Sequence, residues 1–173
     1  KDAMQAAHAR SPVCLYDMEE VMAESIFSVK PENLFNREEP LDIGFVPIYI
    51  LTNQDKLNGA SVSAQEGVLE KVAELLGTNY YVLPSSIHEL LILPDNGSMQ
   101  LSELEAMVRE VNATQVAPED RLSDKVQYYD RETKLLQRGQ EKSVLGRLSD
   151  KKAQLQQADH TAPKQPHRSE VSL

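Results

Sequence analysis

The sequence predicts an α+β fold, in which a small and mostly antiparallel sheet is packed by helices. Short apolar runs bounded by turn residues indicate strands, and two longer segments have the apolar spacing of helices. The turns between strand-like runs are short, which favours antiparallel pairing. We therefore expect three or four strands, near residues 45–52, 79–83, 88–93 and 126–129, and helices near 64–76 and 101–112.

The 173 residues are enough for one domain with appendages. We divide them into an N-terminal helical segment, an acidic linker, the α+β domain and a basic tail, at residues 1–29, 30–44, 45–133 and 134–173. The chain starts with Lys1 inside what reads as the end of a helix, so we interpret it as the C-terminal portion of a longer protein.

The N-terminal segment contains one clear helix start. Asp17 and Glu20 have the spacing of a capping box, and apolar residues follow at helical intervals, at Met18, Val21, Met22 and Ile26. Residues 30–44 contain two prolines and two asparagines in a polar, acidic stretch. Such a composition is typical of a connecting loop, and we expect a flexible link there.

The first strand of the domain is expected at 45–52, where Pro47 lacks an N–H group and so favours a position near the strand start or on an edge. Asn58-Gly59 predicts a tight turn. Ser63 and Glu66 have capping-box spacing ahead of an apolar stripe, and Gly77 is a typical helix-ending residue. These signals predict the helix near 64–76.

Residues 79–83 and 88–93 read as a hairpin joined by Pro84-Ser85-Ser86. Four successive apolar residues, 90–93, predict a central strand that is covered on both faces. Ser102 and Glu105 then predict the start of the helix at 101–112. Two tyrosine pairs, 80–81 and 128–129, lie on expected strands, where one member of each pair should face inward and the other outward.

The charge is divided unevenly along the chain. Residues 1–130 contain 9 basic and 22 acidic side chains, a net charge of -13, whereas residues 131–173 contain 9 basic and 5 acidic side chains, a net charge of +4. An acidic body repels phosphates, so nucleic-acid binding is expected only through the basic tail. Residues 141–157 have a weak helical pattern, and residues 158–173 are expected to be disordered because they include too few apolar residues to form a core.

Composition also limits the chemistry. One cysteine, Cys14, excludes an intrachain disulfide and any zinc site that needs several cysteines, which favours a cytoplasmic protein with Cys14 buried as a small apolar side chain. No apolar run approaches the ~18 residues that span a membrane, so no membrane contact is expected. The sequence predicts no cofactor and no metal.

The candidate polar cluster comprises six residues, Asn53, Asn58, Ser85, Ser86, His88 and Glu89. A serine, a histidine and a carboxylate are the components of an activated nucleophile. In an extended strand, however, Ser86 and His88 share a face while Glu89 points to the other, so Glu89 cannot orient the histidine. We favour the interpretation that the serines cap the turn and that His88 makes a hydrogen bond at the strand entrance.

Two further patterns in this region fall short of a site. His88-Glu89 begins like the zinc-binding H-E-x-x-H helix, but Ile92 stands where the second histidine belongs. Asn58-Gly59 precedes a helix but lacks the repeated glycines and the lysine of a phosphate-binding loop. Asn53 is either a binding residue at the sheet edge or a side chain that closes its own loop, and the second role is the more common.

Several ordered strings resemble the family called domain of unknown function 5688, which occurs in gut-dwelling and related bacteria. They are residues 49–53 (YILTN), 57–60 (LNGA), 83–89 (LPSSIHE), 108–112 (VREVN), 122–124 (LSD) and 129–130 (YD), and the resemblance covers roughly residues 1–133. It implies that the family's N-terminal portion is absent here and that 30–44 is its variable link. The family has no established activity to carry over. Residues 143–148 (SVLGRL) are similar to endings of accessory proteins of bacterial mobile elements.

The sequence therefore predicts a bacterial cytosolic binding or accessory module without catalysis, with an unidentified protein partner. Two alternatives stay open. One is a hydrolase with a site around Ser86 and His88, completed by Asn53 or by carboxylates distant in sequence. The other is that the positive tail docks on nucleic acid or on an acidic partner.

Overall fold

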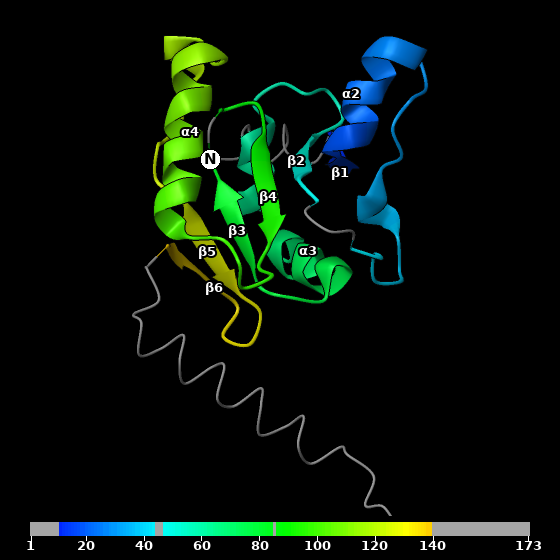
Figure 1. Ribbon diagram of the computed structural model, residues 1–173. Coiled ribbons are helices and arrows are strands. Elements are labelled where there is room, and N and C mark those ends of the chain that lie inside the picture. The colour runs from blue at the N-terminus through cyan, green and yellow to red at the C-terminus, as the bar shows by residue number, and fades with distance from the viewer. Residues whose placement is uncertain (1–10, 44–46, 85, 140–173) are drawn as a thin grey trace, which may run out of the picture. The chain divides into compact units, whose positions relative to one another are not determined.

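An antiparallel sheet of six strands, in the order β1-β2-β4-β3-β5-β6, forms the centre of the fold (Figure 1). The computed structural model describes residues 11–43, 47–84 and 86–139. The chain divides into two units, 1–140 and 141–173, and all the described residues belong to the first. The predicted α+β class is confirmed, with more strands than expected: β1 Val13–Asp17, β2 Tyr49–Asn53, β3 Tyr80–Leu83, β4 Leu90–Pro94, β5 Gln127–Asp130 and β6 Leu135–Arg138.

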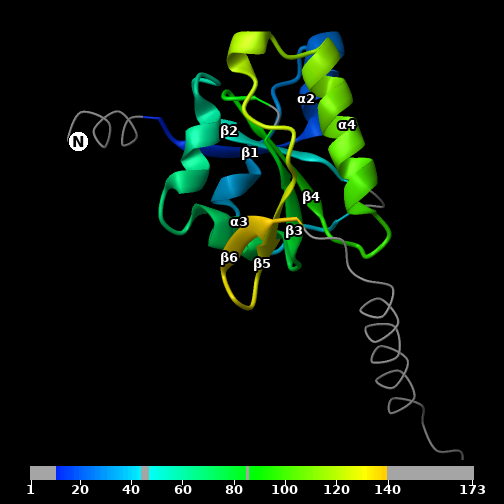
Figure 2. The same cartoon turned by 90° about the vertical axis from the view of Figure 1, so that its left-hand side faces the viewer.

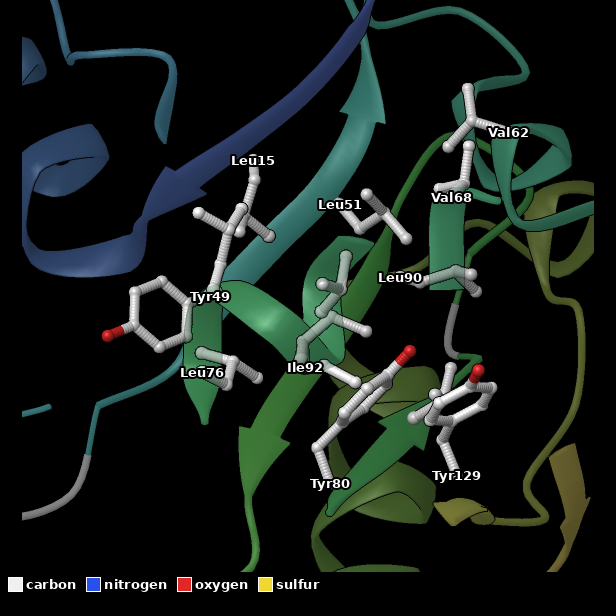
Figure 3. Close-up of a cluster of buried hydrophobic side chains, with 14 of the residues drawn as sticks. Leu15, Tyr49, Leu51, Val62, Val68, Leu76, Tyr80, Leu90, Ile92 and Tyr129 are labelled. Carbon is white, nitrogen blue, oxygen red and sulfur yellow. The ribbon is translucent and has the colours of Figure 1, made fainter. Parts of the chain in front are cut away.

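Side chains alternate along each strand, so apolar residues point to both faces of the sheet, and a helix packs on each face. Helix α3 (Val68–Leu76) and helix α4 (Leu101–Thr114) lie on opposite sides of the sheet (Figure 2). The register places Leu15 opposite Leu51, and Leu51 opposite Leu90, so these three leucines lie in one row on the α3 side. Tyr80 and Tyr129 extend the same core layer (Figure 3).

The second core lies under α4. Leu104 and Val108 of that helix are each 1% exposed and pack against strand residues that point away from α3, chiefly Leu83 and Leu93. β4 is an interior strand of the sheet, between β2 and β3, and Leu90, Ile92 and Leu93 on it are all buried. The central position predicted for the strand at 88–93 is therefore confirmed, although the strand begins only at Leu90.

The tyrosine pairs differ from the prediction. Tyr80 and Tyr129 stack on the α3 side with ring centroids 5.0 Å apart, while Tyr81 and Tyr128 meet on the α4 side, also at 5.0 Å. Tyr81 is only 8% exposed, and Tyr128 is half-buried. The expectation of an outward tyrosine in each pair is wrong, because α4 covers the face that the sequence pattern alone left to solvent.

Both predicted capping boxes of the central helices are displaced. Residues Gly59–Ala64 form a 3-10 helix in which the Ser63 hydroxyl donates to the Ala60 carbonyl, so α3 begins only at Val68, after Gly67 with a φ of 78°. α4 begins one residue before Ser102, and the Gln100 N–H donates to the Glu103 carboxylate at 3.3 Å. The expected pairs, Ser63 with Glu66 and Ser102 with Glu105, are not the caps, because the chain enters each helix at a different residue.

The N-terminal segment contains a strand as well as the expected helix. β1 pairs with β2 along residues 13–17, and helix α2 (Met18–Phe27) follows it directly, beside β1 and away from α4 (Figure 1). Asp17 caps α2 by accepting the Glu19 N–H at 2.7 Å, as predicted. Glu20 does not complete a box, because its carboxylate accepts the Glu32 N–H instead.

The segment expected to be a linker is tied to the edge of the sheet. The Asn33 side chain accepts the Leu15 N–H at 3.0 Å and donates to the Val13 carbonyl at 3.2 Å, so it takes the place of a neighbouring strand on the outer edge of β1. Leu34, in the 3-10 helix Leu34–Asn36, joins the core on the α3 side. Cys14 is 2% exposed, as its expected role required, and its sulfur accepts from the Asn33 amide.

The start of the predicted tail is part of the sheet. β6 pairs with β5 after a turn in which the Asp130 carboxylate accepts the N–H groups of Glu132 and Thr133, so residues 135–138, which the prediction assigned to the basic tail, form a strand of the sheet. The predicted helix end at 1–10, and the helical and disordered parts of the tail at 140–173, lie outside the described residues. In the ranges that the structure does describe, none of the helices has the length and apolarity that crossing a membrane requires.

Candidate functional site

The candidate residues gather at one end of the sheet, where β2 ends and β4 begins. Three segments meet there: residues 53–60 after β2, residues 86–89 before β4, and the 3-10 helix Pro118–Asp120. We call this meeting point the His88 junction. His88 is bonded to both of the other segments through its imidazole ring.

Both ring nitrogens of His88 have partners. The Asn58 backbone N–H donates to Nδ1 at 3.1 Å, and Nε2 lies 3.3 Å from the Asp120 carboxylate. Because Nδ1 accepts, the proton of the neutral ring belongs on Nε2, where it faces Asp120. The His88 and Asp120 side chains are 32% and 33% exposed, so the pair lies at the surface of the junction.

The backbone of the turn is also held at several points. The Ser86 hydroxyl accepts the His88 N–H at 3.0 Å, which is the bond of a serine that caps a turn. The Ile87 N–H donates to the Asp120 carbonyl at 2.8 Å, and the Ile87 carbonyl accepts the Ala60 N–H at 3.1 Å. Ser86 is also bridged to Arg121 as an isolated antiparallel pair. These bonds join all three segments of the junction.

The expected extended strand through His88 is not observed, because residues 87–88 form a bend and β4 starts at Leu90. The alternation argument that separated Glu89 from His88 therefore does not apply. The ring of His88 is instead oriented by Asp120, which lies 32 residues further along the chain. Ser85 lies outside the described residues.

The two candidate asparagines have different roles. The Asn53 side chain donates to the Leu57 carbonyl at 2.9 Å and accepts the Leu57 N–H at 3.2 Å, so it closes its own loop. Asn58 has a left-handed φ of 51° and presents its backbone N–H to His88. Asparagine tolerates that conformation better than most residues, which explains its use at this turn.

Gly59 allows the close approach of the segments. A Cβ at this position would lie 2.8 Å from the Asn53 nitrogen, and still nearer to the Thr52 hydroxyl and the His88 carbonyl. Those last two groups are themselves bonded, because Thr52 Oγ1 donates to the His88 carbonyl at 2.8 Å. Thr52 is 1% exposed, so this bond is sealed inside the protein.

The Glu89 carboxyl group, just before β4, has an altered pKa. Burial raises the pKa of its carboxyl above the ordinary value, and the electrostatic influence of the nearby Lys56 and His88 side chains partly offsets that effect. A raised pKa is a feature of general acids, but it also occurs in any carboxyl group that burial deprives of water. The altered pKa therefore does not by itself define a catalytic role.

The junction brings together a histidine and a carboxylate, but it does not align them with the serine. A histidine that activates a serine needs one free nitrogen to accept the hydroxyl proton. Here Nδ1 accepts a backbone N–H, and the Ser86 oxygen faces the backbone of His88. Among the described residues, no three His, Cys, Asp or Glu side chains are grouped so that they could hold a metal ion.

Sequence reasoning identified His88 and Asn58 but missed Thr52, Gly59 and Asp120 as parts of the junction. The Asn58-Gly59 turn was recognised from its residues, and the close packing of that glycine gave no separate sequence signal. His88 and Asp120 are 32 residues apart in the sequence, so their contact could not be predicted from one sequence. A buried threonine at a strand end has many roles, so Thr52 gave no signal either.

Fold and junction together define a six-stranded antiparallel α+β domain whose loops at one sheet end are joined through a histidine. The model of the family of unknown function DUF5688 matches residues 1–131, and the chain belongs to this family. The match includes five of the six strands and stops before β6. No curated protein and no solved structure matches the chain.

Proposed function

We propose that this protein is a non-catalytic binding or accessory module of the bacterial cytosol. The observation that carries the proposal is the state of His88, since each of its ring nitrogens already has a partner within the protein. A ring used in this way joins loops and has no free nitrogen for a substrate or a nucleophile.

The surrounding bonds support the same function. Residue Ser86 is only 9% exposed, and its hydroxyl accepts a backbone N–H, so the hydroxyl is directed into the turn. Thr52 and the 3-10 helix at 118–120 also bond to backbone groups of the same turn. The polar groups of the junction are thus engaged in holding its three segments together.

A hydrolase is the second candidate, and the His88–Asp120 pair favours it. A carboxylate beside a histidine orients the ring in many hydrolases. To act as a base, His88 would have to release the Asn58 N–H and turn Nδ1 toward a nucleophile. That change would leave the Asn58 N–H without its present acceptor.

Labelling with a fluorophosphonate probe, which reacts with activated serines, separates the two functions. We expect no labelling of the wild-type protein and no ester hydrolysis above buffer. Ser86→Ala and Ser85→Ala variants serve as matched controls, because each removes the hydroxyl of one of two serines that are adjacent in the sequence. Labelling that Ser86→Ala or Ser85→Ala abolishes, or hydrolysis that His88→Gln abolishes in a folded variant, would overturn the proposal.

The C-terminal tail supports two further parts of the proposal, a role in a mobile element and the place of any nucleic-acid contact. The similarity of residues 143–148 to endings of mobile-element accessory proteins supports an accessory role in such an element. Residues 131–173 have a net charge of +4, of which residues 141–173 contribute +2, and this supports the proposal that any contact with nucleic acid is made by the tail alone. Filter binding of a DNA duplex at 50 and 300 mM salt, with and without residues 141–173, tests this. Binding that persists without the tail and does not change with salt would contradict it.

A further inference from the structure

Exposed apolar side chains are concentrated at the end of α2. The described residues include eight large apolar side chains with high exposure, and half of them lie within residues 22–29. They are Met22, Ile26, Phe27 and Val29, with exposed fractions of 64%, 75%, 71% and 65%. We call these four residues the α2 patch.

Within the described residues, nothing packs over this patch closely enough to bury it. None of the ten residues of α2 is buried. The helix is attached through its first residues, where the Met18 N–H donates to the Ile48 carbonyl at 2.9 Å, and through a Glu24–Lys56 pair at 3.9 Å. Isolated helices shorter than about 12–15 residues are marginal in water, so a short helix with an exposed apolar face is typical of an element that packs against a partner.

The geometry of the patch is that of a helix-packing surface. Met22 and Ile26 are four residues apart and therefore lie on one face, one turn above the other. Glu19, three residues before Met22, lies along the same face. Phe27 and Val29 continue the apolar surface at the C-terminal end of the helix and just beyond it.

The charge around the patch selects the partner. α2 and its N-cap contain four acidic residues, at positions 17, 19, 20 and 24, and no basic residue; the neighbouring lysines are Lys56, which pairs with Glu24, and Lys30, which follows the patch. Two copies that met through this helix would bring these carboxylates together, which is unfavourable. A helix with an apolar stripe and lysines or arginines beside it would bury the patch and pair with the carboxylates.

We propose that the α2 patch is a docking site for a basic amphipathic helix of a partner protein. The inference rests on the proposed function and names the surface through which the module binds. Met22 and Ile26 are its central apolar anchors, and the carboxylate of Glu19 is the charged group at its rim.

A synthetic helix tests the site directly. The probe is an 18-residue fluorescein-labelled peptide made only of leucine and lysine, with leucines at i, i+3, i+4 and i+7, and the control peptide has glutamate in place of every lysine. We expect the basic peptide to bind the full chain with a micromolar dissociation constant in fluorescence anisotropy and the acidic peptide not to bind. Increasing the salt concentration from 50 to 300 mM should weaken the binding severalfold.

Matched variants locate the binding. Met22→Ser with Ile26→Ser should weaken binding at least tenfold, or about 1.4 kcal/mol, while Leu57→Ser with Leu135→Ser should stay within twofold. Leu57 and Leu135 are 61% and 58% exposed, so the control removes equally exposed leucines outside the patch. Both pairs should keep the wild-type circular dichroism spectrum, because no buried side chain is changed.

Three results would overturn the proposal. They are equal binding of the acidic peptide, unchanged affinity in the Met22→Ser/Ile26→Ser variant, and a dimer in sedimentation that this variant dissociates, since the last would make a second copy the occupant. Labelling of a serine by the fluorophosphonate probe would reject the proposed function whatever the peptide does. Failure of the peptide experiment alone would remove only the docking site, so the two failures are distinguishable.

Discussion

Replacing Gly59 by alanine is the sharpest test of the His88 junction. The added Cβ would meet the backbone nitrogen of Asn53, the hydroxyl of Thr52 and the carbonyl of His88, all closer than 3.0 Å. Two of these three atoms belong to the backbone, which cannot move away as the end of a flexible side chain can. The methyl group must therefore push the turn before β4 away from the end of β2.

The expected cost follows from two effects. Overpacking of a closely packed site costs about 1–3 kcal/mol. Loss of the buried bond from the Thr52 hydroxyl to the His88 carbonyl adds about 1 kcal/mol. The Gly59→Ala variant should therefore lose about 2–4 kcal/mol of unfolding free energy, a large part of the 5–15 kcal/mol that is typical of a domain.

Urea denaturation followed by circular dichroism measures this loss. Gly97→Ala is the matched control, because Gly97 has a φ of 77° and no atom within 4 Å of a built Cβ. Its cost should be only the backbone strain of about 1 kcal/mol. If Gly59→Ala costs no more than Gly97→Ala, the three segments are not packed as closely as described, and the reasoning about the junction fails.

Three further predictions concern other parts of the fold. Asn33→Ala should cost about 2–3 kcal/mol in urea denaturation, because it leaves groups on the edge of β1 without partners, and an equal loss in Asn36→Ala would refute the role of Asn33. Ending the chain after Gln140 should leave the unfolding free energy unchanged, whereas ending it after Asp130 removes β6 and should lower it; equal stabilities would show that β6 is dispensable. Glu89→Gln should be more stable than wild type at pH 7 and equally stable below about pH 4. The pKa of Glu89 is higher in the folded protein than in the unfolded chain, so the wild type loses unfolding free energy as the pH rises above the unfolded pKa. A pH-independent difference would contradict this.

Much of the fold could be predicted from local patterns. The apolar stripe that ends at Gly77 identified α3, and the unbroken run at 90–93 identified an interior strand. Both signals depend on burial of one segment against the rest of the protein, which leaves a clear mark on the sequence. The antiparallel hairpin of β3 and β4 was likewise predictable from its short turn.

The outer strands were harder to predict, for different reasons. Only four residues of β1, 13–16, are apolar, and they lie between a proline and the cap residue of α2. The proline and the cap are stronger sequence signals, so the strand was not predicted. All four residues of β6 are exposed, and its turn has no glycine, with Lys134 taking the left-handed conformation at a φ of 57°. A strand that buries nothing has no periodic pattern to detect.

The candidate site was predictable in its residues but not in its connections. The Ser86–Glu89 string drew attention through its chemistry, and its backbone bonds are those of a turn. The His88 ring is held by Asp120, which is distant in the sequence, and by the Asn58 backbone N–H. A backbone group leaves no signal in the residue types. Pairings of this kind depend on tertiary structure and need coordinates to be seen.

The two outer edges of the sheet differ within the described residues. The Asn33 side chain blocks the edge at β1, whereas the edge at β6 is open. A polypeptide that sought to extend the sheet beside β1 would find its hydrogen-bonding positions at Val13 and Leu15 already taken. At β6, by contrast, Leu135 and Leu136 flank an exposed backbone. Protection against fibril growth would therefore require a substitution at the β6 edge, such as Leu136→Lys, and none at the β1 edge.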